Sequence, residues 1–135
     1  MTAIMTCVMP LFGIHDQDLW PEGCNVNVYP DAAAALSLHA DDEELFQASR
    51  QNTRILSLTL GAARVLSLRA NWPEPGEVAH HDIVLGHGAL AVMEGMMQKH
   101  YQHEILPQSS PCGVRINLTW RFIAKHQVSC PLGAW

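Results

Sequence analysis

The stretch VRINLTWRFI, residues 114–123, alternates strictly between apolar and polar side chains. Because successive side chains of a strand point to opposite faces, this alternation predicts a strand with two different faces. One face carries Ile116, Leu118, Trp120 and Phe122, and the other carries Arg115, Asn117, Thr119 and Arg121. The apolar face is typical of a core. The two arginines on the other face indicate that it holds either an anionic ligand or buried acids, of which Asp41 is the one evident candidate.

Other stretches of the sequence also alternate between apolar and polar residues. CNVNVYPD (24–31) predicts a buried strand whose polar inner face bears Asn25, Asn27 and Tyr29. RILSLTL (54–60) and RVLSLR (64–69) are separated by a glycine turn, and we expect them to pair as a β-hairpin. We expect a second hairpin from HDIVL and ALAVM across the GHG turn at 86–88.

Helical periodicity is scarce. We expect a helix only before Cys24, together with a short turn or helix where MMQKHYQHEIL begins, before its extended part. Short strands separated by Pro and Gly turns favour a mainly β architecture, a barrel or sandwich such as a jelly roll.

Length and composition exclude several classes of protein. The chain has 135 residues, which suits a single domain. Its 48% hydrophobic content, 16% charged content and net charge of −5 argue against a disordered tail and against a broadly basic nucleic-acid coat. Four scattered cysteines without a CxxC pair predict reduced thiols rather than a zinc knuckle. No apolar run reaches the roughly 20 residues of a membrane span, so we expect an intracellular protein with no membrane association.

A metal site is indicated by His39-Ala40-Asp41 among the eight histidines. Alternate positions on a strand would place the imidazole and the carboxylate on one face, about 6.6 Å apart at Cα. One further histidine from a neighbouring strand would complete the two-histidine, one-carboxylate set of non-haem Fe(II) oxygenases. Taken alone, the tripeptide is better explained by a solvated His and Asp on the surface. The remaining histidines outside KHYQHEIL are expected at the surface or in turns.

Five stretches together resemble the AlkB family of Fe(II)- and 2-oxoglutarate-dependent dioxygenases. They are NVNVYPD, LHADDE, ILSLTLGAARVLSLR, IVLGHGALAVMEGMMQKHYQHEIL and RINLTWR, and they cover roughly residues 25–122. The resemblance implies a double-stranded β-helix (jelly-roll) core over residues 25–126, a partial N-terminal segment at 1–24 and a tail at 127–135. Because only 24 residues precede Asn25, we do not expect a full N-terminal nucleotide-recognition lid.

The resemblance also implies the ligands of the metal. His39, Asp41 and His103 would bind Fe(II), and His103 is preferred over its neighbour His100 because it matches the distal histidine of the motif. O₂ and 2-oxoglutarate are the implied cosubstrates.

For 2-oxoglutarate, the resemblance implies that Arg115, with Asn117 and Tyr29, holds the distal carboxylate. Arg121 and Asn27 would lie near the metal-bound end. The two arginines are about 20 Å apart at Cα along a strand, so they would flank a small dianion rather than grip one carboxylate together.

The implied reaction is oxidative demethylation of N-alkylated bases such as N1-methyladenine or N3-methylcytosine in DNA or RNA. Asp42 and Glu43 would contact the base, although a solvated acidic turn explains them nearly as well. Two alternatives remain: a 2-oxoglutarate dioxygenase acting on a protein or small molecule, and a catalytically silent fragment. We expect a monomer.

Overall fold

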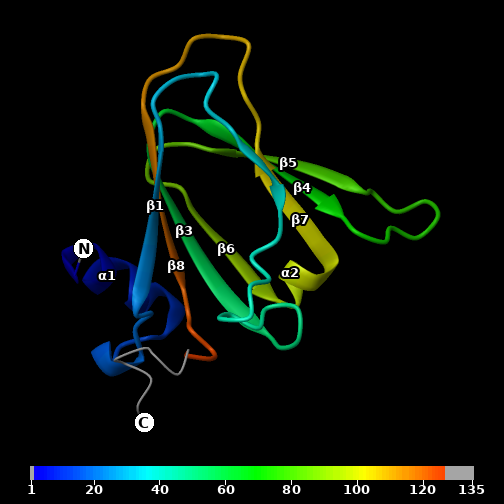
Figure 1. Ribbon diagram of the computed structural model, residues 1–135. Coiled ribbons are helices and arrows are strands. Elements are labelled where there is room, and N and C mark those ends of the chain that lie inside the picture. The colour runs from blue at the N-terminus through cyan, green and yellow to red at the C-terminus, as the bar shows by residue number, and fades with distance from the viewer. Residues whose placement is uncertain (1, 127–135) are drawn as a thin grey trace.

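The computed structural model describes residues 2–126, and strands dominate this part of the chain (Figure 1). Within it, eight strands form two antiparallel sheets of four, in the orders β1-β8-β3-β6 and β2-β7-β4-β5. The first sheet contains β1 (Gly23–Tyr29), β8 (Arg115–Arg121), β3 (Thr53–Gly61) and β6 (Leu90–Gly95). The second contains β2 (Leu36–His39), β7 (Tyr101–Ile105), β4 (Arg64–Ala70) and β5 (His80–Leu85). The predicted jelly-roll core is confirmed, and the predicted tail at 127–135 lies outside the described residues.

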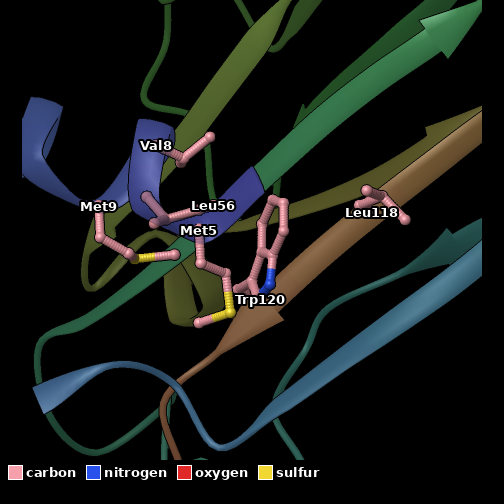
Figure 2. Close-up of a cluster of buried hydrophobic side chains, with 6 residues drawn as sticks. All are labelled: Met5, Val8, Met9, Leu56, Leu118 and Trp120. Carbon is pink, nitrogen blue, oxygen red and sulfur yellow. The ribbon is translucent and has the colours of Figure 1, made fainter. Parts of the chain in front are cut away.

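The two faces of β8 are both covered, which explains the alternation of its sequence. Leu118 and Trp120 pack with Leu56 of β3 beneath the N-terminal helices, α1 (Thr2–Val8) and η1 (Met9–Phe12). Figure 2 shows Met5, Val8 and Met9 seated on this face of the sheet. Trp120 is completely buried, and truncating such a side chain costs about 3–5 kcal/mol. The polar face of β8 therefore points between the two sheets.

The two predicted hairpins are wrong. Strands β3 and β4 belong to different sheets, and so do β5 and β6. The corner between β3 and β4 depends on Gly61, which has φ +87° and whose added Cβ would lie 2.2 Å from the carbonyl oxygen of Val114. Alternation within a strand is the same whether the next strand pairs with it or crosses to the opposite sheet, so the local pattern does not distinguish the two connections.

Strand β1 is less buried than expected, because it lies at the edge of its sheet. It pairs with β8, placing Asn27 opposite Asn117 and Tyr29 opposite Arg115. Its outer side chains Val26 and Val28 are 53% and 59% exposed. The prediction of a buried strand is therefore wrong for the outer face, while the inner face carries the expected polar residues.

Helices play a small part in the described structure. Besides α1 and η1 there are η2 (Gln17–Leu19) and α2 (Met97–His100), which leads directly into β7 as the sequence predicts. No helix within residues 2–126 combines the length and apolar character needed to cross a bilayer. Among the described residues, Cys7, Cys24 and Cys112 are free thiols, as expected, and Cys130 lies outside this part of the chain.

Candidate metal centre and cosubstrate pocket

Three of the predicted residues, His39, Asp41 and His103, meet in the interior between the sheets. Each offers one donor atom, and these atoms lie within 4.8 Å of one another. His39 is the last residue of β2 and is the register partner of His103 on β7. This pairing places the two imidazole rings 4.3 Å apart, centroid to centroid. His100, the alternative ligand, is exposed and contacts Trp72 instead.

Asp41 reaches this cluster by a route that strand alternation did not predict. Strand β2 ends at His39, so the expectation that Asp41 shares a strand face with it is wrong. The backbone N–H of Asp41 instead donates to Oε1 of Gln98 at 2.9 Å, and Arg121 Nη2 donates to Asp41 Oδ1 at 2.7 Å. Gln98 was missed as a functional residue, although it begins the QxHYxHxI pattern of the sequence.

The possible metal-ligand atoms of this cluster form no hydrogen bonds with one another, so their lone pairs remain available to a metal ion. His39 Nε2 and His103 Nε2 lie 3.8 and 3.9 Å from the Asp41 carboxylate oxygens, too far for hydrogen bonds. Asp41 Oδ2 is buried without a hydrogen-bond partner. His39 Nδ1 is 2.8 Å from the carbonyl oxygen of Ser37, so a proton on Nδ1 leaves the Nε2 lone pair free. Two imidazoles and one carboxylate fit Fe(II).

The protonation state of His103 also suits a ligand. Burial, followed by the neighbouring His39, lowers the pKa of His103 from 6.5 to about 4, and the Arg121 charge adds to this while Asp41 opposes it. His103 is therefore neutral at pH 7. Only a neutral imidazole offers a lone pair to a metal.

A second set of buried polar groups surrounds Arg115 in the same cavity. Arg115 is 1% exposed, and its guanidinium carbon lies 4.8 Å from the centre of the Tyr29 ring. Its Nη2 donates to Thr59 Oγ1 at 3.0 Å, but Nε and Nη1 have no hydrogen-bond partner. Within residues 2–126, no carboxylate forms an ion pair with Arg115. Since burying an unpaired charge is costly, this guanidinium fits a carboxylate ligand.

The two arginines of β8 therefore have different surroundings. Arg121 is paired with an acid, Asp41, as one of the two interpretations of the sequence required. Arg115 has no such partner. Burial lowers the pKa of the Arg115 guanidinium and raises the pKa of the Tyr29 phenol, while the Arg115 charge pulls the Tyr29 pKa down. Arg115, the arginine without an ion pair among residues 2–126, starts β8, whereas Arg121 ends it beside the His and Asp cluster.

Asn117 of β8, the predicted partner of Arg115, is held in a network of hydrogen bonds with Ser57 and Thr119. The Asn117 amide donates to Ser57 Oγ at 2.8 Å and accepts from Thr119 Oγ1 at 2.9 Å. Ser57 and Thr59 were missed by sequence reasoning, although both alternate with the leucines of RILSLTL. Asn27 also lines the cavity.

Arg64 of β4 is a second fully buried arginine, and it lies outside the residues that line the cavity. It is 0% exposed, and its guanidinium carbon lies 5.5 Å from the centre of the Tyr29 ring. It donates to the backbone carbonyls of Asp31, Ala34 and Leu106, which fixes the loop after β1 and the end of β7. Its two terminal nitrogens are thus engaged by backbone carbonyls, while its Nε has no hydrogen-bond partner within residues 2–126.

Asp42 and Glu43, the predicted base-contacting residues, follow Asp41 directly. Both are exposed. Their carboxylates therefore lie outside the buried cluster while remaining tied to it by the backbone of Asp41.

Comparison with known proteins agrees with this geometry. The 2OG-Fe(II) oxygenase superfamily matches residues 11–121. The chain belongs to this superfamily. Within the superfamily it is 32% identical over 102 residues to alpha-ketoglutarate-dependent dioxygenase alkB homolog 3 of Mus musculus, covering 72% of this chain and 35% of that protein. It is 26% identical over 117 residues to DNA oxidative demethylase ALKBH2 of Arabidopsis thaliana, covering 73% and 36%. The AlkB resemblance is confirmed.

Comparison with solved structures supports the same oxygenase fold. The structure of OsALKBH1 matches with a TM-score of 0.58 at 23% identity, covering 76% of this chain and 50% of that one. The chain spans about a third of the length of the curated relatives that it matches. The expected cofactors, Fe(II), 2-oxoglutarate and O₂, are confirmed at the level of the oxygenase superfamily.

Proposed function

We propose that the chain forms the core of an Fe(II)- and 2-oxoglutarate-dependent dioxygenase that demethylates N-alkylated bases of DNA or RNA. One observation carries this proposal: a metal-competent cluster lines the same cavity as the buried Arg115, which forms no ion pair with a carboxylate among residues 2–126. His39, Asp41 and His103 would hold the iron. Bound Fe(II) would supply the one-electron and O₂ chemistry that amino-acid side chains lack.

The residues of β8 and β1 would bind and orient 2-oxoglutarate. Arg115 would take the distal carboxylate through its unpaired N–H groups, beside the buried Tyr29 hydroxyl, which interacts with the same guanidinium. Asn117 would keep the polar wall in place through its bonds to Ser57 and Thr119. Arg121 and Asn27 would serve the metal-bound end, where Arg121 also fixes one oxygen of Asp41.

Asp42 and Glu43 would read the substrate. Exposed carboxylates accept hydrogen bonds, and the exocyclic amino groups of adenine and cytosine are the matching donors on a flipped base. The similarity to a DNA oxidative demethylase supports a nucleic-acid substrate. N1-methyladenine and N3-methylcytosine are the proposed lesions, because each retains such an amino group.

The test is turnover with the two products followed separately. Metal-free protein is loaded with Fe(II) and 2-oxoglutarate without oxygen, then given O₂ and an oligonucleotide carrying one methylated base. We expect succinate and formaldehyde in equal amounts, loss of both in His103→Ala, and retention of both in the matched control His100→Ala. Succinate without formaldehyde would argue for a different substrate class. Absence of both, with no metal retained, would contradict the enzyme assignment.

A further inference from the structure

Gln98 is a buried amide whose position depends on a four-residue helix. It lies on α2 (Met97–His100) between β6 and β7 and is 3% exposed. Its Oε1 accepts the backbone N–H of Asp41 at 2.9 Å, across 57 residues of sequence. Its Nε2 donates to Met93 Sδ at 3.5 Å. Both ends of the amide are therefore engaged inside the protein.

Asp41 needs such an anchor more than the two histidines do. His39 and His103 are paired with each other in the β2–β7 ladder, which fixes their backbones. Asp41 lies two residues beyond His39, where β2 has ended. Without Gln98 its backbone N–H would be a buried donor without a partner. Arg121 holds the carboxylate from β8, and Gln98 holds the backbone from α2.

The Met93 contact sets the direction of the amide. A thioether sulfur accepts hydrogen bonds and has no proton to donate. The NH₂ group of Gln98 must therefore face Met93, and the oxygen is left facing Asp41. A flipped amide would place two donors, Nε2 and the Asp41 N–H, against each other.

We propose that Gln98 is a positioning residue that fixes the backbone of Asp41 and so aims its carboxylate at the metal. The proposal rests on the proposed function, since it concerns the same metal site. The hydrogen bonds of Gln98 reach the backbone of Asp41 and the sulfur of Met93. Because Gln98 holds the Asp41 backbone, its loss should weaken metal binding.

The experiment replaces Gln98 with methionine, which keeps the length and the helix propensity but removes the acceptor. Gln102→Met is the matched control, because Gln102 lies on β7 next to His103 and points to the opposite strand face. Co(II) binding to the metal-free proteins is followed by its visible absorption. Supporting residues of this kind typically change metal affinity by roughly 10–100-fold. We expect a loss of that size and an altered spectrum in Gln98→Met, and no change beyond about twofold in the control.

Hydrogen exchange of the Asp41 amide gives a readout that needs no metal. Protection should fall in Gln98→Met while the amides of His39 and His103 keep theirs. Gln98→Asn, which is shorter by one methylene, provides a second variant and should weaken Co(II) binding in the same direction. Wild-type affinity and spectrum in folded Gln98→Met would overturn the positioning role. Failure of the wild-type protein to bind Co(II) would overturn the metal site itself, and this proposal with it.

Discussion

Replacing Arg115 with methionine should remove 2-oxoglutarate binding without weakening the protein in the absence of that ligand. The substitution costs one hydrogen bond to Thr59, about 1 kcal/mol, and the cation–π contact with the Tyr29 ring, about 2 kcal/mol when desolvated. It also removes a buried charge that has two unpaired N–H groups and no carboxylate partner within residues 2–126, which is worth several kcal/mol in the opposite direction. The free energy of unfolding without ligand should therefore be unchanged or higher.

The ligand-bound state should respond in the opposite way. Truncating one partner of a buried charge pair costs about 2–5 kcal/mol of binding free energy, a weakening of roughly 30-fold to several thousand-fold. At a 2-oxoglutarate concentration of 100 times its Kd, the wild-type protein gains about 2.7 kcal/mol. For a domain of this size that raises Tm by roughly 10 °C. At the same concentration the variant should gain less than about 1 kcal/mol.

The assay is thermal unfolding of the Mn(II)-loaded proteins with and without 2-oxoglutarate, in the absence of oxygen. Arg69→Met is the matched control, since Arg69 is half exposed and pairs with Glu104 outside the cavity. The control should keep the wild-type shift. An undiminished shift in Arg115→Met would refute its role as the carboxylate site. A large loss of stability in that variant without ligand would refute the inference that its charge is unpaired.

Three further predictions concern the connection between β3 and β4, the pH dependence of stability and the choice of substrate base. Gly61→Ala should lower the free energy of unfolding by roughly 2–5 kcal/mol in urea titration, because Gly61 has a positive φ and an added Cβ would clash with the carbonyl oxygen of Val114. Gly86→Ala, with open space at its Cβ, should leave the free energy of unfolding unchanged. Because the His103 pKa falls from 6.5 to about 4 on folding, the metal-free protein should be most stable above pH 6.5 and lose up to about 3 kcal/mol as the pH falls to 4. His103→Gln should flatten the plot of unfolding free energy against pH between pH 6.5 and 4. Equal slopes in the wild-type and variant proteins would contradict the lowered pKa of His103. Asp42→Ala should change the preference between methylated bases more than succinate formation, and a parallel loss of both would remove its substrate role.

The sequence by itself determined the character of each strand face. Strict alternation in RINLTWR separated the core residues from the polar residues, and the structure places them on the helix-covered face and the cavity face respectively. The resemblance to the AlkB family implied the three residues of the cluster, His39, Asp41 and His103. The first inference depends on a local property, because the side-chain period of a strand is set by consecutive residues.

Tertiary structure alone decided the pairing of elements and the partners of buried polar groups. The hairpin predictions failed because consecutive strands cross between sheets, and the placement of Asp41 depends on Gln98 and Arg121, which are 57 and 80 residues away. The same holds for the two arginines of β8. They share one face and one residue type, yet Arg121 meets an acid and Arg115 does not, because charge pairing depends on what the fold brings within a few ångströms rather than on sequence neighbours.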